Sequence, residues 1–177
     1  ALIADLAHAG PDHTVITGDI VNISLPVEFE RATRWLERIG SPDRLTVIPG
    51  NHDAYIRLPW ADTIGQWRPW MTDELRTPPA APSGPDEFPF VRIRDRIDDG
   101  GRAGAVPMAI GAAGGRIGPA QLERLRACLE TLRARDLCRV VLVHHPPFED
   151  RRHRRKELED AAELRAVIAD AGAELFL

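Results

Sequence analysis

The segment Leu45-Thr46-Val47-Ile48-Pro49-Gly50-Asn51-His52-Asp53 indicates both the fold and the position of a site. Its first four residues form a short apolar and β-branched run, which is typical of a buried strand, and polar side chains follow from Gly50 onward. The preceding residues, Pro26 to Ile39, place apolar side chains on one helical face and stop at Gly40. A helix followed by a buried strand is a unit of an α/β fold, and such folds bind ligands at the carboxyl ends of their strands.

The same order of a strand and a polar cluster occurs twice more. His13 to Thr17 reads as a strand and precedes Gly18-Asp19, and Val140 to Val143 reads as a strand and precedes His144-His145. Short connections between alternating strands and helices imply right-handed crossovers and a largely parallel sheet. We therefore expect the three polar clusters to meet at one edge. Further helices are expected at 2–10, 119–135 and 157–171, and a further strand at 174–177.

Composition narrows the class of protein. A chain of 177 residues with 44% hydrophobic and 28% charged residues predicts one folded globular domain. The net charge of −4 argues against general nucleic-acid binding, which needs a basic surface. No apolar run reaches the roughly 20 residues that span a bilayer, so we expect no membrane association and a cytoplasmic location. Nothing in the sequence predicts an oligomeric state.

The residue types in the three clusters suit a metal site. Asp19 offers a carboxylate, Asn51 an amide oxygen and His144 a neutral imidazole, which are ligands for manganese, iron or zinc. A carboxylate can also bridge two ions. Taken singly, Asp19 could cap a helix, Asn51 could form a turn and His144 could be a core histidine. Their common position after buried strands favours a shared metal centre.

The segments 17–22 (Thr-Gly-Asp-Ile-Val-Asn), 47–53 and 144–146 (His-His-Pro) resemble the central motifs of the calcineurin-like metallophosphoesterases. The bacterial branch of cyclic-nucleotide phosphodiesterase-like proteins is the most similar. This resemblance implies an α/β fold, a sandwich of β-sheets flanked by helices, of which the chain would hold a part. It also implies two divalent metal ions, Mn, Fe, Zn or similar, with Asp19 bridging both ions and with Asn51 and His144 binding the second.

The resemblance further implies a metal-dependent phosphoester hydrolase, in particular a phosphodiesterase, in which a metal-bound hydroxide attacks the phosphate. His52 would contact the phosphate or the leaving oxygen, and Asp53 would orient the His52 imidazole. The implied substrate is a phosphorylated small molecule or a nucleotide. The alternative is a non-catalytic protein of the same fold that acts as a scaffold for a protein partner.

Several features depart from the family pattern. An upstream Asp-x-His and a downstream Gly-His-x-His motif are absent, so we interpret residues 1–177 as one metallophosphoesterase domain truncated at both ends, whose activity is impaired. Asp5 and His8 have the wrong spacing to replace the first motif. The glycine-rich stretch 98–118 lies where the family has an apolar strand, and a compromised core is expected there. The basic run 151–156 either steers phosphate or forms a solvated surface.

Overall fold

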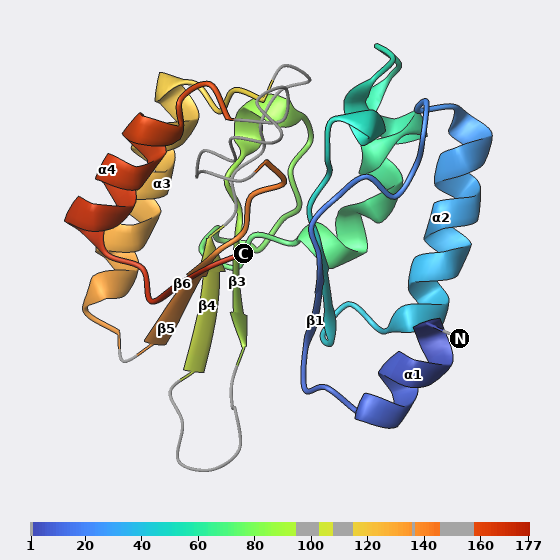
Figure 1. The fold of residues 1–177 in the computed structure, drawn as a ribbon, viewed down its shortest axis with the longest axis horizontal. Helices are drawn as coiled ribbons and strands as arrows, with labels where there is room; N and C mark the ends of the chain where they lie inside the picture. The colour runs from blue at the N-terminus through green and yellow to red at the C-terminus, as the bar shows by residue number, and fades with distance from the viewer. Residues whose placement is uncertain (1, 95–102, 108–114, 136, 146–157) are drawn as a thin grey trace, which may run out of the picture.

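A computed structural model describes residues 2–94, 103–107, 115–135, 137–145 and 158–177, with only the backbone described for 103–107. Two β-sheets lie between two layers of helices (Figure 1). The first sheet pairs β1 (Thr14–Ile16) with β2 (Leu45–Val47) in parallel, with Thr14 opposite Leu45. The second has the order β3-β4-β5-β6, in which β3 is antiparallel to β4 and the remaining pairs are parallel. Its strands are β3 (Val91–Arg94), β4 (Ala103–Pro107), β5 (Leu137–Val141) and β6 (Leu175–Phe176).

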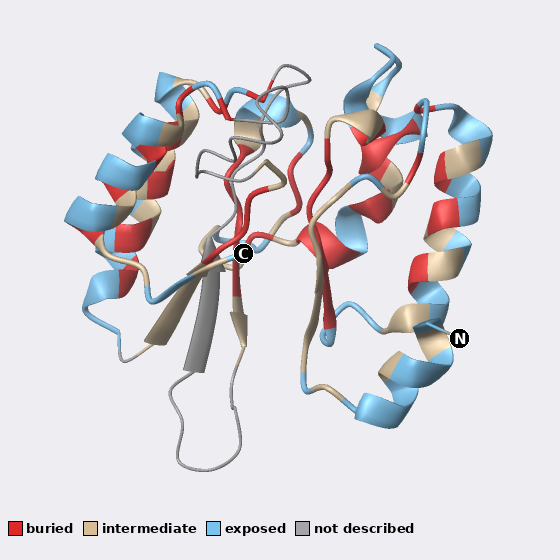
Figure 2. Ribbon diagram, viewed as in Figure 1, coloured by how far each residue is buried: buried red, intermediate tan, exposed pale blue. Residues whose placement is uncertain are grey.

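Helices cover the outer side of each sheet, which confirms the predicted partial sandwich (Figure 1). The helix α2 (Pro26–Ile39) flanks the two-stranded sheet, and α3 (Pro119–Arg133) and α4 (Ala161–Ala171) flank the four-stranded sheet. The apolar face of α2 buries Phe29, Ala32 and Leu36, as its periodicity predicts. Figure 2 shows the buried residues gathered where helices and sheets meet.

A tryptophan-rich segment supplies much of the first core. It forms two 3₁₀ helices, η2 (Trp60–Asp62) and η3 (Ile64–Met71), and Trp67 packs against Phe29 with ring centroids 5.1 Å apart. Pro69 within η3 removes a backbone donor, which favours this tighter and irregular winding over a regular α-helix. The segment therefore contributes to packing of the core.

The helix α1 (Leu2–Ala9) has no buried residue and lies beside the amino end of β1 (Figure 1). Asp5 and His8 thus belong to an exposed helix at the opposite end of β1 from Asp19. Across the part of the chain that the structure describes, no helix combines the length and the apolar character needed to cross a membrane.

The second sheet corrects three sequence-based expectations. The strand β4 lies inside the glycine-rich stretch, where an apolar strand was expected to be missing, and β3 was not predicted at all. Backbone hydrogen bonds to neighbours on both sides hold β4, and such pairing overrides the weak strand propensity of Gly and Ala. The strand predicted at 140–143 begins earlier, at Leu137. The last helix begins at Ala161, and the predicted start at residue 157 lies outside the described residues.

A buried cation connects the two sheets. The Arg92 guanidinium of β3 is 3% exposed, and its Nη1 donates hydrogen bonds to the carbonyl oxygens of Leu45, at 2.8 Å, and Trp70, at 2.7 Å. His13, just before β1, lies close enough to be affected by this charge. Its Nε2 is 2.8 Å from the Thr46 Oγ1, and burial lowers the pKa of His13 to about 4, assisted by the positive charges of Arg94 and Arg92.

This environment makes stability depend on pH. An unfolded chain binds a proton on His13 near pH 6.5, whereas the folded chain binds it only near pH 4. The stabilisation is therefore complete above pH 6.5 and is lost as the pH falls toward 4. Lowering the pH from 7 to 4.5 should decrease the free energy of unfolding of the unaltered chain. In His13→Gln this decrease should be smaller, by at most about 2 kcal/mol. Urea unfolding at both pH values measures this, with exposed His8→Gln as the control. Equal pH dependence in both variants would contradict the assignment.

Candidate metal centre

The three polar clusters expected to meet do lie together. Because β1 and β2 are parallel, Asp19 and Asn51 follow the same edge of the first sheet, and His144 reaches this edge from the segment after β5. The Nε2 atom of His144 is 3.0 Å from the Oδ1 of Asn51 and 3.3 Å from the Oδ1 of Asp19. The predicted convergence of these side chains is confirmed, while their roles as metal ligands remain a prediction.

The hydrogen bonding of His144 suits it to bind a metal. Its Nδ1 lies 2.7 Å from the carbonyl oxygen of Thr17, which can only accept, so Nδ1 carries a proton. In a neutral imidazole Nε2 then presents a lone pair, and it faces the Asn51 amide oxygen and the Asp19 carboxylate. When Nε2 carries no proton, three electron-pair donors face one position, an arrangement that a cation would stabilise. A carbonyl behind the remote nitrogen is also the usual support for a metal-binding histidine.

Two glycines permit this close approach. Gly18 has φ +100°, and a Cβ there would lie 2.9 Å from the Nδ1 of His144. At Gly50 a Cβ would lie 2.6 Å from the Asp19 backbone nitrogen and 2.7 Å from the Cε1 of His144. Both positions therefore exclude a side chain, and Asp19 itself adopts φ 56°, a conformation that aspartate tolerates better than most residues. Gly18 and Gly50, which precede Asp19 and Asn51, are therefore required because no larger residue has room at either position.

Asp53 organises the backbone of the site. Its carboxylate is 1% exposed and accepts hydrogen bonds from the backbone N–H groups of Asp19 at 2.8 Å, Val21 at 2.9 Å and Gly50 at 2.7 Å. Burial raises its pKa, and these three hydrogen bonds oppose the rise. The carboxylate thus ties the loop after β1 to the loop after β2.

The expected orienting role of Asp53 toward His52 is not what the structure shows. The Nδ1 of His52 lies 2.8 Å from the carbonyl oxygen of Asn22, which takes the place assigned to the Asp53 carboxylate. The Asp53 carboxylate instead accepts hydrogen bonds from backbone N–H groups of the site. Sequence adjacency suggested a pair, but successive residues of a tight turn face different directions.

His52 is held from several sides. Its backbone N–H donates to the Oδ1 of Asp19 at 3.0 Å, and its ring stacks on Tyr55 with centroids 6.2 Å apart. Ser24 donates from Oγ to the carbonyl of His52 at 2.5 Å and accepts from the Tyr55 N–H at 2.9 Å. No sequence pattern indicates the parts played by Asn22 and Ser24, because both act through contacts with a segment about 30 residues away.

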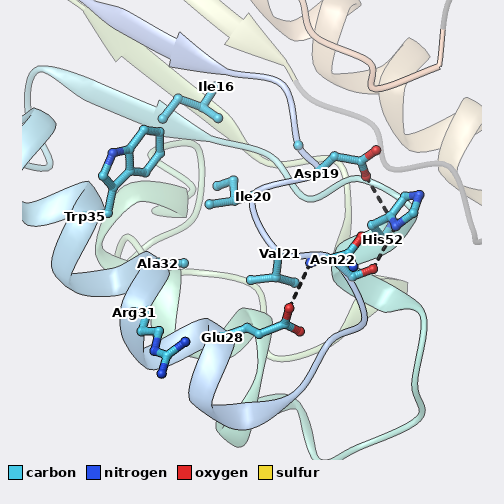
Figure 3. A pocket seen from close by; sticks show the side chains of 11 residues that line it. Ile16, Asp19, Ile20, Val21, Asn22, Glu28, Arg31, Ala32, Trp35 and His52 are labelled. Carbon is cyan, nitrogen blue, oxygen red and sulfur yellow. Dashed lines mark hydrogen bonds between the residues drawn. The ribbon is translucent and has the colours of Figure 1, made fainter. Parts of the chain in front are cut away.

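A groove of about 730 Å³ extends from the proposed centre along α2 (Figure 3). Asp19 and His52 line one end, and residues of α2 line the other. Because His52 uses Nδ1 for the Asn22 carbonyl, its Nε2 is the nitrogen available to a bound molecule.

The remaining candidate residues are placed as follows. His145 packs its ring edge-on against His144, with centroids 4.9 Å apart. Pro146 and the basic run 151–156 lie outside the described residues. Within the described ranges, no three His, Cys, Asp or Glu side chains gather as they would around a metal. The cluster at the sheet edge combines one carboxylate and one imidazole with the side-chain amide of Asn51.

Two sheets flanked by helices, with Asp, Asn and His side chains after strands, define an α/β protein with a polar site at the carboxyl ends of its strands. A sequence profile described as calcineurin-like phosphoesterase matches residues 1–173, and the chain belongs to this family. The family consists of metal-dependent phosphoesterases, in agreement with the resemblance of the motifs. No curated protein sequence matches the chain significantly.

Proposed function

We propose that the chain binds a divalent metal ion through Asp19, Asn51 and His144 and acts on a phosphodiester. One observation carries the proposal: the Nε2 of His144 lies 3.0 Å from the Oδ1 of Asn51 and 3.3 Å from the Oδ1 of Asp19, while the Thr17 carbonyl fixes the Nδ1 of His144. A bound divalent metal ion would supply positive charge to the phosphoryl oxygens and lower the pKa of a bound water molecule toward 7. In its narrower form, the proposal is that the chain belongs to the cyclic-nucleotide phosphodiesterase-like branch of the family.

Each residue has a separate task in this site. Asp19 has two carboxylate oxygens and can serve two ions, while its Oδ1 also receives the His52 N–H. Asn51 and His144 would bind one of these ions together with Asp19. His52 directs Nε2 toward the bound phosphoester, where it stabilises or protonates the leaving oxygen when it carries a second proton. Asp53 acts as a positioning residue, because it holds the two loops that bear Asp19 and Asn51.

The described residues cluster three ligands around one position. A dinuclear centre needs further ligands for its other ion, so turnover by this chain is expected to be slow compared with a chain that binds two ions. This expectation concerns rate, and binding of the first ion does not depend on it.

The contrast between Asp19→Asn and His52→Ala tests the proposal. Asp19→Asn keeps an acceptor for the His52 N–H but removes the negative charge, so we expect Mn²⁺ affinity to fall at least about 100-fold. His52→Ala should retain Mn²⁺ affinity and lose roughly 10²- to 10⁴-fold in turnover of bis(p-nitrophenyl) phosphate. Calorimetric Mn²⁺ titration and steady-state kinetics provide the two measurements.

His8→Ala, an exposed histidine of α1, is the matched control and should change neither quantity. Equal loss of Mn²⁺ in the two site variants would make His52 a ligand. Wild-type turnover in His52→Ala would make it a bystander. Failure of the unaltered chain to bind Mn²⁺ would overturn the proposal and favour the scaffold alternative.

A further inference from the structure

Glu28, the third residue of α2, makes more hydrogen bonds than a helix cap requires. Its carboxylate accepts from the backbone N–H of Leu25 at 2.9 Å, the usual contact of a glutamate at this position. It also accepts from the N–H groups of Ile23 at 3.2 Å and Asn22 at 3.3 Å, which lie before the helix. These hydrogen bonds lower the pKa of Glu28, and the positive charge of Arg31 lowers it further. The carboxylate therefore fixes the end of the loop between β1 and α2.

The segment that Glu28 fixes is the one that holds His52. The carbonyl oxygen of Asn22 lies 2.8 Å from the Nδ1 of His52, and the Oγ of Ser24 donates to the His52 carbonyl. In Figure 3, Asn22 lies between Glu28 and His52, bonded to Glu28 through its N–H and to His52 through its carbonyl. Because a carbonyl can only accept, it keeps the proton of a neutral imidazole on Nδ1. Nε2 is then the nitrogen available to a bound molecule.

The backbone of this segment depends on its hydrogen bonds. Ser24 adopts φ 60°, in the left-handed region that serine rarely occupies. Such a conformation persists only where surrounding contacts maintain it. Asn22 and Ile23 are exposed, so burial of their side chains does not hold them. Loss of the Glu28 carboxylate would let this backbone relax, and the Asn22 carbonyl would move with it.

A different carboxylate holds the first part of the same loop. Asp53 accepts hydrogen bonds from the backbone N–H groups of Asp19 and Val21. Asp19 is a proposed metal ligand, whereas the part of the loop that Glu28 binds contacts His52. The two carboxylates therefore support different parts of the site, Asp53 the metal side and Glu28 the His52 side.

We propose that Glu28 is a positioning residue for His52. It fixes the Asn22 carbonyl, which in turn sets the tautomer and the direction of the His52 imidazole. The expected effect on turnover rests on the proposed function, in which His52 assists the leaving oxygen of the phosphoester. The effect on the imidazole itself requires neither metal nor substrate. The start of α2 would thus control the rate of the reaction separately from metal binding.

The first test observes the His52 ring in the metal-free chain by ¹⁵N NMR at mildly alkaline pH, with the signal assigned by comparison with His52→Ala. Nδ1 should carry the proton in the unaltered chain. Glu28→Ala should lower the population of this tautomer at least about 2-fold, because the proton on Nδ1 loses its fixed acceptor. Glu28→Gln retains a side-chain oxygen that can accept and should keep most of it. An unchanged tautomer in Glu28→Ala would overturn the proposal.

The second test measures turnover of two phosphodiesters by the Mn²⁺-loaded chain. Assistance to the leaving oxygen matters more for a poor leaving group, so diphenyl phosphate should depend on His52 more than bis(p-nitrophenyl) phosphate does. Glu28→Ala should lower kcat about 10-fold for diphenyl phosphate and less for the nitrophenyl ester. KM and Mn²⁺ affinity should not change. Glu28→Gln should restore most of the lost turnover.

Glu30→Gly is the matched control, because it weakens α2 at an exposed position through the low helix propensity of glycine. It should lower the melting temperature but change neither the tautomer nor the ratio of the two rates. Equal losses for the two phosphodiesters in Glu28→Ala, or a raised KM as its main effect, would overturn the proposal. No turnover by the unaltered chain, together with the expected tautomer change in Glu28→Ala, would overturn the proposed function and leave the positioning of His52 standing.

Discussion

Gly50→Ala should lower the proposed Mn²⁺ affinity of the chain at least about 100-fold and remove the proposed turnover of phosphodiesters. The added Cβ would lie 2.6 Å from the Asp19 backbone nitrogen, 2.7 Å from the Cε1 of His144 and closer still to the Oδ1 of Asp19. Metal sites tolerate displacements of only about 0.2 Å in their ligand distances. The substitution forces Asp19 or His144 to move by more than that, and calorimetric Mn²⁺ titration measures the consequence.

A second glycine separates this effect from a general loss of stability. At Gly65 a Cβ would meet the Trp60 carbonyl oxygen at 2.5 Å, within the tryptophan-rich segment of the core. Both substitutions should reduce the free energy of unfolding by about 1–3 kcal/mol, but Gly65→Ala should leave Mn²⁺ affinity intact. Gly84→Ala, which has open space around the new methyl group, should change neither quantity. Normal Mn²⁺ binding by Gly50→Ala would show that the metal does not lie between Asp19 and His144.

Asp53→Ala should produce the largest loss of stability among single changes in the site. The substitution leaves the backbone N–H groups of Asp19, Val21 and Gly50 without their acceptor. Hydrogen bonds to a buried carboxylate are among the stronger ones, and the combined cost is on the order of 4 kcal/mol. For a domain of this size the melting temperature should fall by about 8–16 °C. Mn²⁺ affinity should fall as well, because the loops that carry the ligands are no longer joined.

The variant Asp53→Asn sharpens this test. Asparagine retains one acceptor oxygen but directs an NH₂ group toward N–H donors. The melting temperature of Asp53→Asn should therefore lie between those of the unaltered chain and Asp53→Ala. Exposed Asp12→Ala is the control and should melt within about 2 °C of the unaltered chain. A normal melting temperature together with a large loss of turnover in Asp53→Ala would instead support direct participation in the chemistry.

Local patterns in the sequence were sufficient for the central part of the fold. The apolar run before Gly50 and the periodicity of α2 reflect the burial of one face, which each segment records in its own residues. The same holds for Asp19 and Asn51, since polar residues that follow the paired strands β1 and β2 lie at one sheet edge. His144 follows β5 of the other sheet, so its approach to them depends on how the two sheets pack. Membership of the calcineurin-like phosphoesterase family agrees with these motifs.

Pairing partners and buried environments were decided by tertiary structure. The strand β4 lies in a glycine-rich stretch, and its neighbours β3 and β5 hold it through hydrogen bonds that no local pattern records. The role of Asp53 was misjudged because the backbone N–H groups of Asp19 and Val21, which donate to its carboxylate, belong to a loop more than 30 residues away. Burial lowers the pKa of His13, and Arg94 and Arg92, which β3 brings close, lower it further. Sequence thus determined which residues are chemically suitable, whereas long-range packing determined their partners, since hydrogen bonding, burial and charge depend on distances that only the folded chain sets.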